Sequence, residues 1–175
     1  RLLVGQVGID LIAGPSEIVI LADQTANPAW IAADLLSQAE HDPLASAMLI
    51  STQPDQLQAV QNALDSQLQK LPRHESARKS LTDWGALISV DDLETGIWLI
   101  NRLAPEHLEL CIEDPWSHLS SIRNAGAIFL GHHTPEPVGD YFAGPNHVLP
   151  TMGSARFASA LSVQDFSTRS SIISA

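Results

Sequence analysis

The stretch SEIVILADQTANPAWIAADLLSQAEHDP (Ser16–Pro43) contains the two signals that decide the fold. Up to Asp23 it is a short apolar, β-branched run bounded by a Gly-Pro dipeptide and by polar residues, which is typical of a buried strand. Asn27 can cap a helix whose first position is Pro28, and Pro43 ends that helix. A strand followed directly by a helix is the repeating unit of an α/β fold.

The same alternation of apolar runs and helical segments continues along the chain. The other expected elements are a strand at 45–52, a helix at 54–71, a helix at 74–84, a strand at 85–90, a helix at 92–104, a strand at 107–113, a short helix at 115–126 and a strand at 127–131. Strands of this length between helices predict βαβ units, and therefore an α/β domain with a mostly parallel sheet and helices on both faces.

Composition limits the classes of partner. The 175 residues carry a net charge of −11 with nine Lys and Arg, which argues against a nucleic-acid partner and against an anionic membrane surface. No apolar run approaches the length of a membrane span. Cys111 lies in the apolar run LELCIED and is expected to be a buried small hydrophobe rather than a reactive thiol. A reducing, cytoplasmic setting fits a chain with one cysteine.

The helix after Pro28 carries the first candidate site. Asp34, Gln38 and His41 are spaced i, i+4 and i+7 and share one helical face. Spacing alone favours a solvated polar stripe over a metal site. A cationic His41 near the end of the helix would also suit simple capping.

The stretch LAPEHLEL (Leu103–Leu110) carries the second candidate site, the adjacent acid and imidazole of Glu106 and His107. Strand neighbours point to opposite faces, but Pro105 should end the preceding helix and hold Ala104 extended, which places the pair in the turn before the strand. Such a turn lies at the amino edge of a parallel sheet, whereas ligands usually bind at the carboxyl edge. Either the strand begins later or the site reaches round the amino edge.

The Pro- and Gly-rich segment HHTPEPVGDYFAGPNHVLPT (132–151) is the third candidate, because long loops in compact domains tend to be functional. It carries Asp140 and His147, and its neighbouring His132 and His133 are expected to be a surface pair. A mononuclear metal site is possible from these His, Asp and Glu residues. The sequence has no GxGxxG or P-loop motif, so no nucleotide site follows from a motif, and the residues alone leave the reaction type open.

Five segments together resemble a known family. GIDLIAGPSEIVILAD, NPAWIAADLLSQAEHDP, NRLAPEHLEL, NAGAIFLG and GDYFAGPNHVLPT occur in this order along nearly the whole chain. They are similar to histidinol dehydrogenase, which oxidises L-histidinol through L-histidinal to L-histidine with NAD⁺ in the last step of histidine biosynthesis. The resemblance implies a Rossmann-like three-layer domain, one zinc ion per site and an intertwined homodimer whose partner chain completes the site.

The resemblance also implies a role for individual residues. Gln38, His41 and Asp140 match zinc ligands, and Glu106 and His107 match the catalytic pair. The implied substrate contacts are Ser16, Gln38, His41, His107, Asp140 and His147. In this family the metal orients the substrate, the histidine takes the alcohol proton, and the glutamate activates the water that adds to the aldehyde.

The family's enzyme is more than twice as long as this chain. The resemblance implies a connecting arm at 1–15, a Rossmann-like domain with the zinc and catalytic residues at 16–161, and an arm at 162–175 that leads back to another domain. The NAD-binding residues and the fourth zinc ligand are expected outside these 175 residues. We therefore expect the 175-residue chain to be inactive alone. Two alternatives remain: a truncated, non-catalytic paralogue or binding module with the same fold, and a zinc hydrolase that uses metal-activated water.

Overall fold

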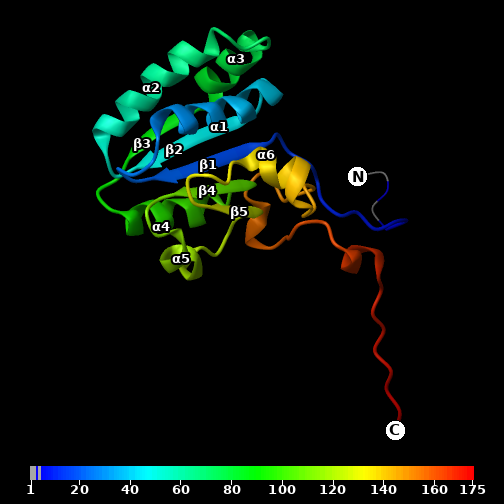
Figure 1. Cartoon of the computed structure of the whole chain (residues 1–175). Coiled ribbons are helices and arrows are strands. Elements are labelled where there is room, and N and C mark those ends of the chain that lie inside the picture. Colours follow the sequence, from blue (N-terminus) through cyan, green and yellow to red (C-terminus); the bar gives the residue numbers. More distant parts are fainter. Residues whose placement is uncertain (1–2, 4) are drawn as a thin grey trace.

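Five parallel strands form the central sheet, in the order β3-β2-β1-β4-β5 (Figure 1). The computed structural model describes residue 3 and residues 5–175. The strands are β1 (Glu17–Ala22), β2 (Ser46–Ser51), β3 (Ala86–Ser89), β4 (His107–Cys111) and β5 (Ala127–Leu130). The helices are α1 (Pro28–His41), α2 (Pro54–Leu68), α3 (His74–Trp84), α4 (Leu93–Leu103), α5 (Pro115–His118) and α6 (Glu136–Val138). The predicted α/β fold with a parallel sheet is therefore confirmed.

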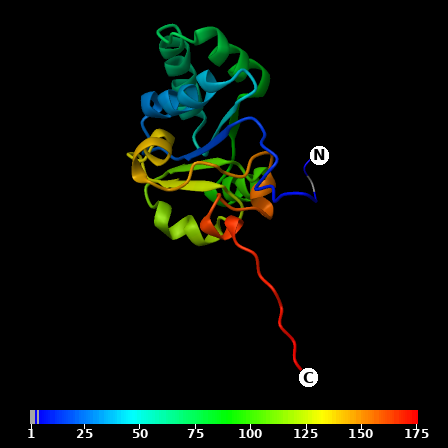
Figure 2. The same cartoon turned by 90° about the vertical axis from the view of Figure 1, so that its right-hand side faces the viewer.

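Two apolar cores lie on the two faces of the sheet (Figures 1 and 2). Ile18 and Ile20 of β1 point into the core beneath α1, α2 and α3, whereas Val19 and Leu21 point into the core beneath α4. Because β1 is central and covered on both faces, its sequence is a continuous apolar run rather than an alternating one. Each fully buried side chain of this size contributes about 1.5–3 kcal/mol to stability.

The predicted caps position α1. The side chain of Asn27 accepts a hydrogen bond from the Ala29 N–H at 2.8 Å, and Pro28 occupies the first turn. The helix ends at His41, where Asp42 turns to an extended backbone. Because α1 starts at the carboxyl end of β1 and leads to the start of β2, its last turn lies at the amino edge of the sheet (Figure 1).

The helix expected at 115–126 is shorter than predicted, because α5 ends at His118 and only a 3₁₀ turn at Leu119–Ser121 follows. The side chain of Asn101 on α4 explains this end. Its Oδ1 accepts the backbone N–H groups of Arg123 at 2.6 Å and Asn124 at 3.2 Å. These donors are thereby unavailable to a continuing helix.

The backbone at Ala104 also differs from the prediction. Pro105 follows the end of α4 as expected, but Ala104 is left-handed (φ 53°, ψ 59°) rather than extended. Its N–H donates to the Ile100 carbonyl at 2.8 Å, the pattern of a helix C-cap. The turn needed to enter β4 outweighs the ordinary preference of a residue before proline.

After β5 the chain folds back over the sheet through α6 and a π-helical turn, η2 (Gly139–Ala143). The chain then becomes mostly irregular, and its last residues extend away from the sheet and helices (Figure 2). The domain limits at 15 and 161 stay a prediction. No helix in the described part of the chain combines the length and apolar character needed to cross a membrane.

Gly126 is a point at which the fold tolerates no side chain. A Cβ there would lie 2.6 Å from the backbone carbonyl oxygen of Glu106. We expect Gly126→Ala to lower the free energy of unfolding by about 1–3 kcal/mol, measured by urea denaturation, because the backbone must move. Gly8→Ala is the control, since a Cβ there has no atom within 4 Å. Equal denaturation midpoints for the two variants would contradict the expectation.

Candidate active site

One residue of β1 holds both members of the Glu106–His107 pair. The Glu17 N–H donates to Glu106 Oε2 at 2.9 Å, and the Glu17 carbonyl oxygen lies 3.0 Å from His107 Nδ1. Glu106 Oε2 is also 3.6 Å from His107 Nδ1. The acid and the imidazole therefore lie side by side, because Glu106 stands in the turn and only His107 belongs to β4.

These contacts decide the question about the sheet edge. β4 begins at His107, which pairs with Ile18 near the start of β1. The strand does not begin later, so the pair lies at the amino edge. A parallel sheet usually binds ligands at its other edge, and the candidate site is therefore unusual in its place on the fold.

The hydrogen bond to Glu17 also selects the tautomer of His107. A carbonyl oxygen only accepts, so Nδ1 carries the proton and Nε2 presents its lone pair. Nε2 is buried and has no hydrogen-bond partner among the described residues. Burial lowers the pKa of His107. His107 is therefore neutral at pH 7 and has a free proton-accepting nitrogen.

The segment after β5 adds two carboxylates beside that nitrogen. Asp140 Oδ1 lies 3.7 Å and Glu136 Oε1 lies 3.9 Å from His107 Nε2. One ligand atom from each of these three side chains falls within 4.8 Å of the others, a spacing that can hold a metal ion. The sequence interpretation missed Glu136, although an acid four residues before Asp140 on a helical turn was a usable signal.

The polar face of α1 turns inward, so the interpretation as a solvated stripe is wrong. Gln38 is 4% exposed, and its buried Oε1 has no partner among the described residues. Asp34 is partly buried, and its carboxyl group lies beside that of Glu109 on β4. His41 is exposed in the last turn, yet its charge lowers the pKa of His107. The reason is that α1 packs on the sheet over β1 and β2 and places Asp34 beside Glu109 of β4, which the sequence of α1 cannot reveal.

The carboxyl groups of the site are buried together. Burial is the largest cause of their raised pKa values, which are about 9 for Glu109, 8 for Glu136, 7 for Glu106 and 6 for Asp34. Neighbouring carboxylates raise the pKa of the three glutamates further. No Lys or Arg in the described ranges forms an ion pair with any of them. Such a cluster favours a cation, because a cation would offset both the repulsion and the desolvation.

The other predicted residues occupy different positions. Ser16 directly precedes β1 and is partly buried at the amino edge, whereas His147 is exposed on the loop after η2. His132 is half-buried, with Nε2 3.0 Å from Thr25 Oγ1, so only His133 of the expected surface pair is exposed. Cys111 is 7% exposed, and burial raises the pKa of its thiol, which confirms a buried small hydrophobe.

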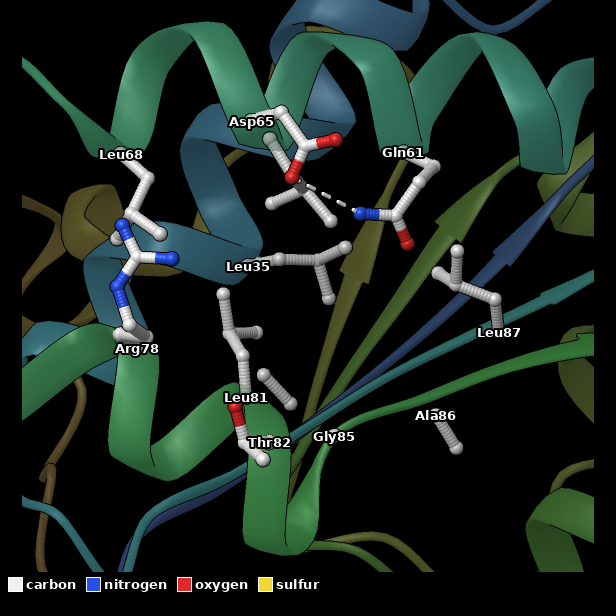
Figure 3. A pocket seen from close by; sticks show the side chains of 12 residues that line it. Leu35, Gln61, Asp65, Leu68, Arg78, Leu81, Thr82, Gly85, Ala86 and Leu87 are labelled. Atoms are coloured by element: carbon white, nitrogen blue, oxygen red, sulfur yellow. Dashed lines mark hydrogen bonds between the residues drawn. The ribbon is translucent and has the colours of Figure 1, made fainter.

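A separate groove of about 410 Å³ lies between α2 and α3, over the edge of the sheet at β3 (Figure 3). Leu35, Leu64 and Leu87 line its apolar part, and Asp65 and Arg78 extend over it. None of the predicted site residues in the described part of the chain contributes to this lining. The groove and the acid–base pair are therefore distinct places on the protein.

Comparison with known proteins identifies the family. The family model described as histidinol dehydrogenase matches residues 1–175. The chain belongs to the histidinol dehydrogenase family. It is similar to the histidinol dehydrogenases of Oleidesulfovibrio alaskensis, at 62% identity over 175 residues, and of Halalkalibacterium halodurans, at 58% over 174 residues.

A solved relative of the histidinol dehydrogenase family shares the fold. The crystal structure of histidinol dehydrogenase from Elizabethkingia anophelis matches with a TM-score of 0.87 and 42% identity, over 89% of this chain and 36% of that chain. The match to the Oleidesulfovibrio protein covers 100% of this chain and 40% of that protein. The chain thus spans well under half the length of the histidinol dehydrogenases that it matches.

The buried carboxyl of Glu109 predicts a pH-dependent stability. Its pKa is about 9 in the folded protein and about 4.5 when unfolded, so its contribution is fully favourable below about pH 4.5 and is lost as the pH rises towards 9. Glu109→Gln cannot titrate. We expect the free energy of unfolding of Glu109→Gln minus that of the unsubstituted protein to rise by at least about 1 kcal/mol between pH 5 and pH 9, measured by denaturation without metal. Glu113→Gln, at an exposed carboxyl beyond β4, is the control, and a pH-independent difference for Glu109→Gln would refute this account.

Proposed function

We propose that the protein containing this chain is a zinc-dependent histidinol dehydrogenase, which oxidises L-histidinol through L-histidinal to L-histidine with NAD⁺ as the hydride acceptor. Membership of the family supports the reaction. The observation that carries the proposal is the buried pair of bases held by Glu17, with His107 Nε2 free to accept a proton. A pure binding module has no use for two buried bases that lower its stability.

His107 is the base of the first oxidation. Its Nε2 takes the hydroxyl proton of the alcohol while the hydride leaves the carbon that bears the hydroxyl. Its low pKa keeps it neutral, and the Glu17 carbonyl orients the ring and stabilises the imidazolium that forms. A carbonyl acceptor at Nδ1 also prevents the tautomer that would carry its proton on Nε2.

Glu106 is the base of the second oxidation. The aldehyde must add water before a second hydride can leave, and a carboxylate can remove the proton of that water. Burial raises the pKa of Glu106 to about 7, which makes it a stronger base than an exposed glutamate. The Glu17 N–H fixes one of its oxygens, so the other remains available to the water.

Gln38, His41 and Asp140 would hold the zinc ion. The donor set of amide oxygen, imidazole and carboxylate suits zinc, and the buried Gln38 Oε1 lacks any other partner among the described residues. Glu136 and the Nε2 of His107 lie beside Asp140, at a spacing that could add to this donor set. When bound there, zinc would fix the imidazole and amine of the substrate. The side chains of the chain then supply the proton transfers.

The usual dinucleotide position on this sheet does not fit NAD⁺. The turn between β1 and α1 runs from Asp23 to Asn27, contains no glycine and begins with a buried acid. A glycine-free, acidic turn cannot cradle a pyrophosphate as a Rossmann fingerprint does. NAD⁺ therefore belongs elsewhere in the enzyme, and only the proton transfers are assigned to this domain.

The homodimer and the cytoplasmic location are part of the same proposal. Phe142, Phe157 and Phe166 are more than four-fifths exposed on the loops after β5, as are Ile172 and Ile173. Large apolar side chains exposed outside the two cores support contacts with another chain or domain. The single buried thiol suits a reducing compartment.

The two bases should fail at different steps. In the protein expressed from its complete gene, we expect His107→Asn to slow NADH formation from L-histidinol by about 100-fold or more. Glu106→Gln should slow NADH formation from L-histidinal by a similar factor. In a single turnover with L-histidinol, this variant should still carry out the first hydride transfer. His74→Asn, at an exposed histidine on α3, is the control. Identical defects in both variants at both steps would rule out the division of roles.

Removal of one proposed ligand should weaken zinc binding. We expect Gln38→Leu to weaken the affinity for zinc by at least about tenfold, measured by competition with a chelator, because the buried oxygen is lost. Gln58→Leu, on the exposed side of α2, should bind zinc as the native protein does. Native zinc affinity in Gln38→Leu would exclude Gln38 as a ligand.

A further inference from the structure

We propose that Glu109 is a positioning residue, which ties the segment carrying Asp140 and Glu136 to the same face of β4 that presents His107. The residue lies two positions after His107, so both side chains point to the α1 side of the sheet. Glu109 is 1% exposed, and its oxygens accept hydrogen bonds from the backbone N–H of Glu136 and the Cys111 thiol, neither of which is a proposed zinc ligand. This inference rests on the proposed function only in one of its two tests, the measurement of zinc affinity.

The first observation is a hydrogen bond between β4 and the segment after β5. Glu109 Oε1 accepts the backbone N–H of Glu136 at 2.8 Å, and this bond is buried. Glu136 is the first residue of α6, so its N–H has no partner within its own helix. Asp140 follows four residues later, within the same run of helical turns. The carboxyl group of Glu109 therefore holds this segment against β4.

The second observation is a link to α1. The carboxyl groups of Glu109 and Asp34 are neighbours, and each affects the pKa of the other. Asp34 lies one turn before Gln38 and two turns before His41 on the same face of α1. Glu109 thus contacts both elements that carry the proposed zinc ligands, one through a side chain and one through a backbone amide.

The third observation is a close contact three residues further along this segment. A Cβ on Gly139 would meet the Phe129 ring of β5 at 2.5 Å, so this glycine permits close packing there. Phe129 lies opposite Glu109 in the β4–β5 register. The two contacts therefore hold the segment at Glu136 and at Gly139, and loss of the Glu109 carboxyl group removes the contact at Glu136.

If position 109 served packing alone, an apolar residue there would make the folded protein more stable than glutamate does. The site is fully buried between the α1 helix and the sheet, where Ile20 of β1 is its neighbour in register. A buried carboxyl without a cation lowers stability, and the burial penalty raises its pKa. Positioning of the Glu136 N–H and of Asp34 is the compensating role that the contacts supply.

The experiment compares Glu109→Leu with Glu109→Gln in the protein expressed from its complete gene. Leucine keeps the volume but cannot accept the Glu136 N–H, whereas glutamine retains an acceptor and gains a donor for Asp34. Leu110→Ala is the control, because that side chain lies in the core on the opposite face of β4. Glu109→Thr replaces Glu109→Leu if the latter does not fold, since threonine is too short to reach Glu136.

Hydrogen exchange of the peptide covering 135–144 is the first readout. We expect exchange at least about tenfold faster in Glu109→Leu and near-native exchange in both Glu109→Gln and Leu110→Ala. The second readout is zinc affinity, which should fall by about 10- to 100-fold in Glu109→Leu only. Exchange and affinity in Glu109→Leu that match those of Leu110→Ala would overturn the proposal, because loss of core stability would then explain everything.

The two proposals fail separately. If the native protein neither binds zinc nor oxidises L-histidinol, the proposed function is wrong, and the exchange comparison still decides the role of Glu109. If the native protein does both but Glu109→Leu leaves the exchange of 135–144 unchanged, the positioning role is wrong and the function stands.

Discussion

The parallel pairing of β1 with β4 is the interaction on which the site depends. At the first residue of β1, the N–H and the carbonyl of Glu17 bind Glu106 and His107 in turn, so one backbone position orients an acid and a base. The pairing is kept in register by the buried side chains of both strands. A slip of one residue would exchange His107 for an apolar neighbour on the α1 face. The strand pairing that stabilises the sheet thus also fixes the geometry of the two bases.

Electrostatics explains why this place is suited to chemistry rather than to stability. Three buried glutamates and the partly buried Asp34 have raised pKa values, and no basic side chain of the described residues pairs with them. Two of them, Glu106 and Glu136, lie within 4 Å of the neutral His107. Such an arrangement opposes folding, since each charge is desolvated and repels its neighbours. A cation bound there would offset this repulsion.

The location at the amino edge follows from two returns of the chain. α1 runs back from the carboxyl end of β1 and brings Gln38 and His41 to this edge, and the segment after β5 folds back to bring Glu136 and Asp140 (Figure 1). The carboxyl edge of the sheet, where dinucleotides bind in Rossmann folds, carries the acidic turn at Asp23 instead. The domain has kept the strand order of that fold while its proposed site lies at the other end.

The sequence by itself determined the strands, the helices, the parallel sheet and the polar residues of interest, because apolar periodicity, the Asn27 cap and the positions of proline act over a few neighbouring residues. It misjudged the polar face of α1, the backbone of Ala104 and the end of α5, and it overlooked Glu136 and Glu109. Each of these depends on a partner distant in the chain: Glu109 beside Asp34, Asn101 beside Asn124, and the segment after β5 beside His107. Only the tertiary structure decided that two adjacent residues, one in a turn and one in a strand, lie side by side, because the atoms that hold them belong to Glu17, about ninety residues earlier.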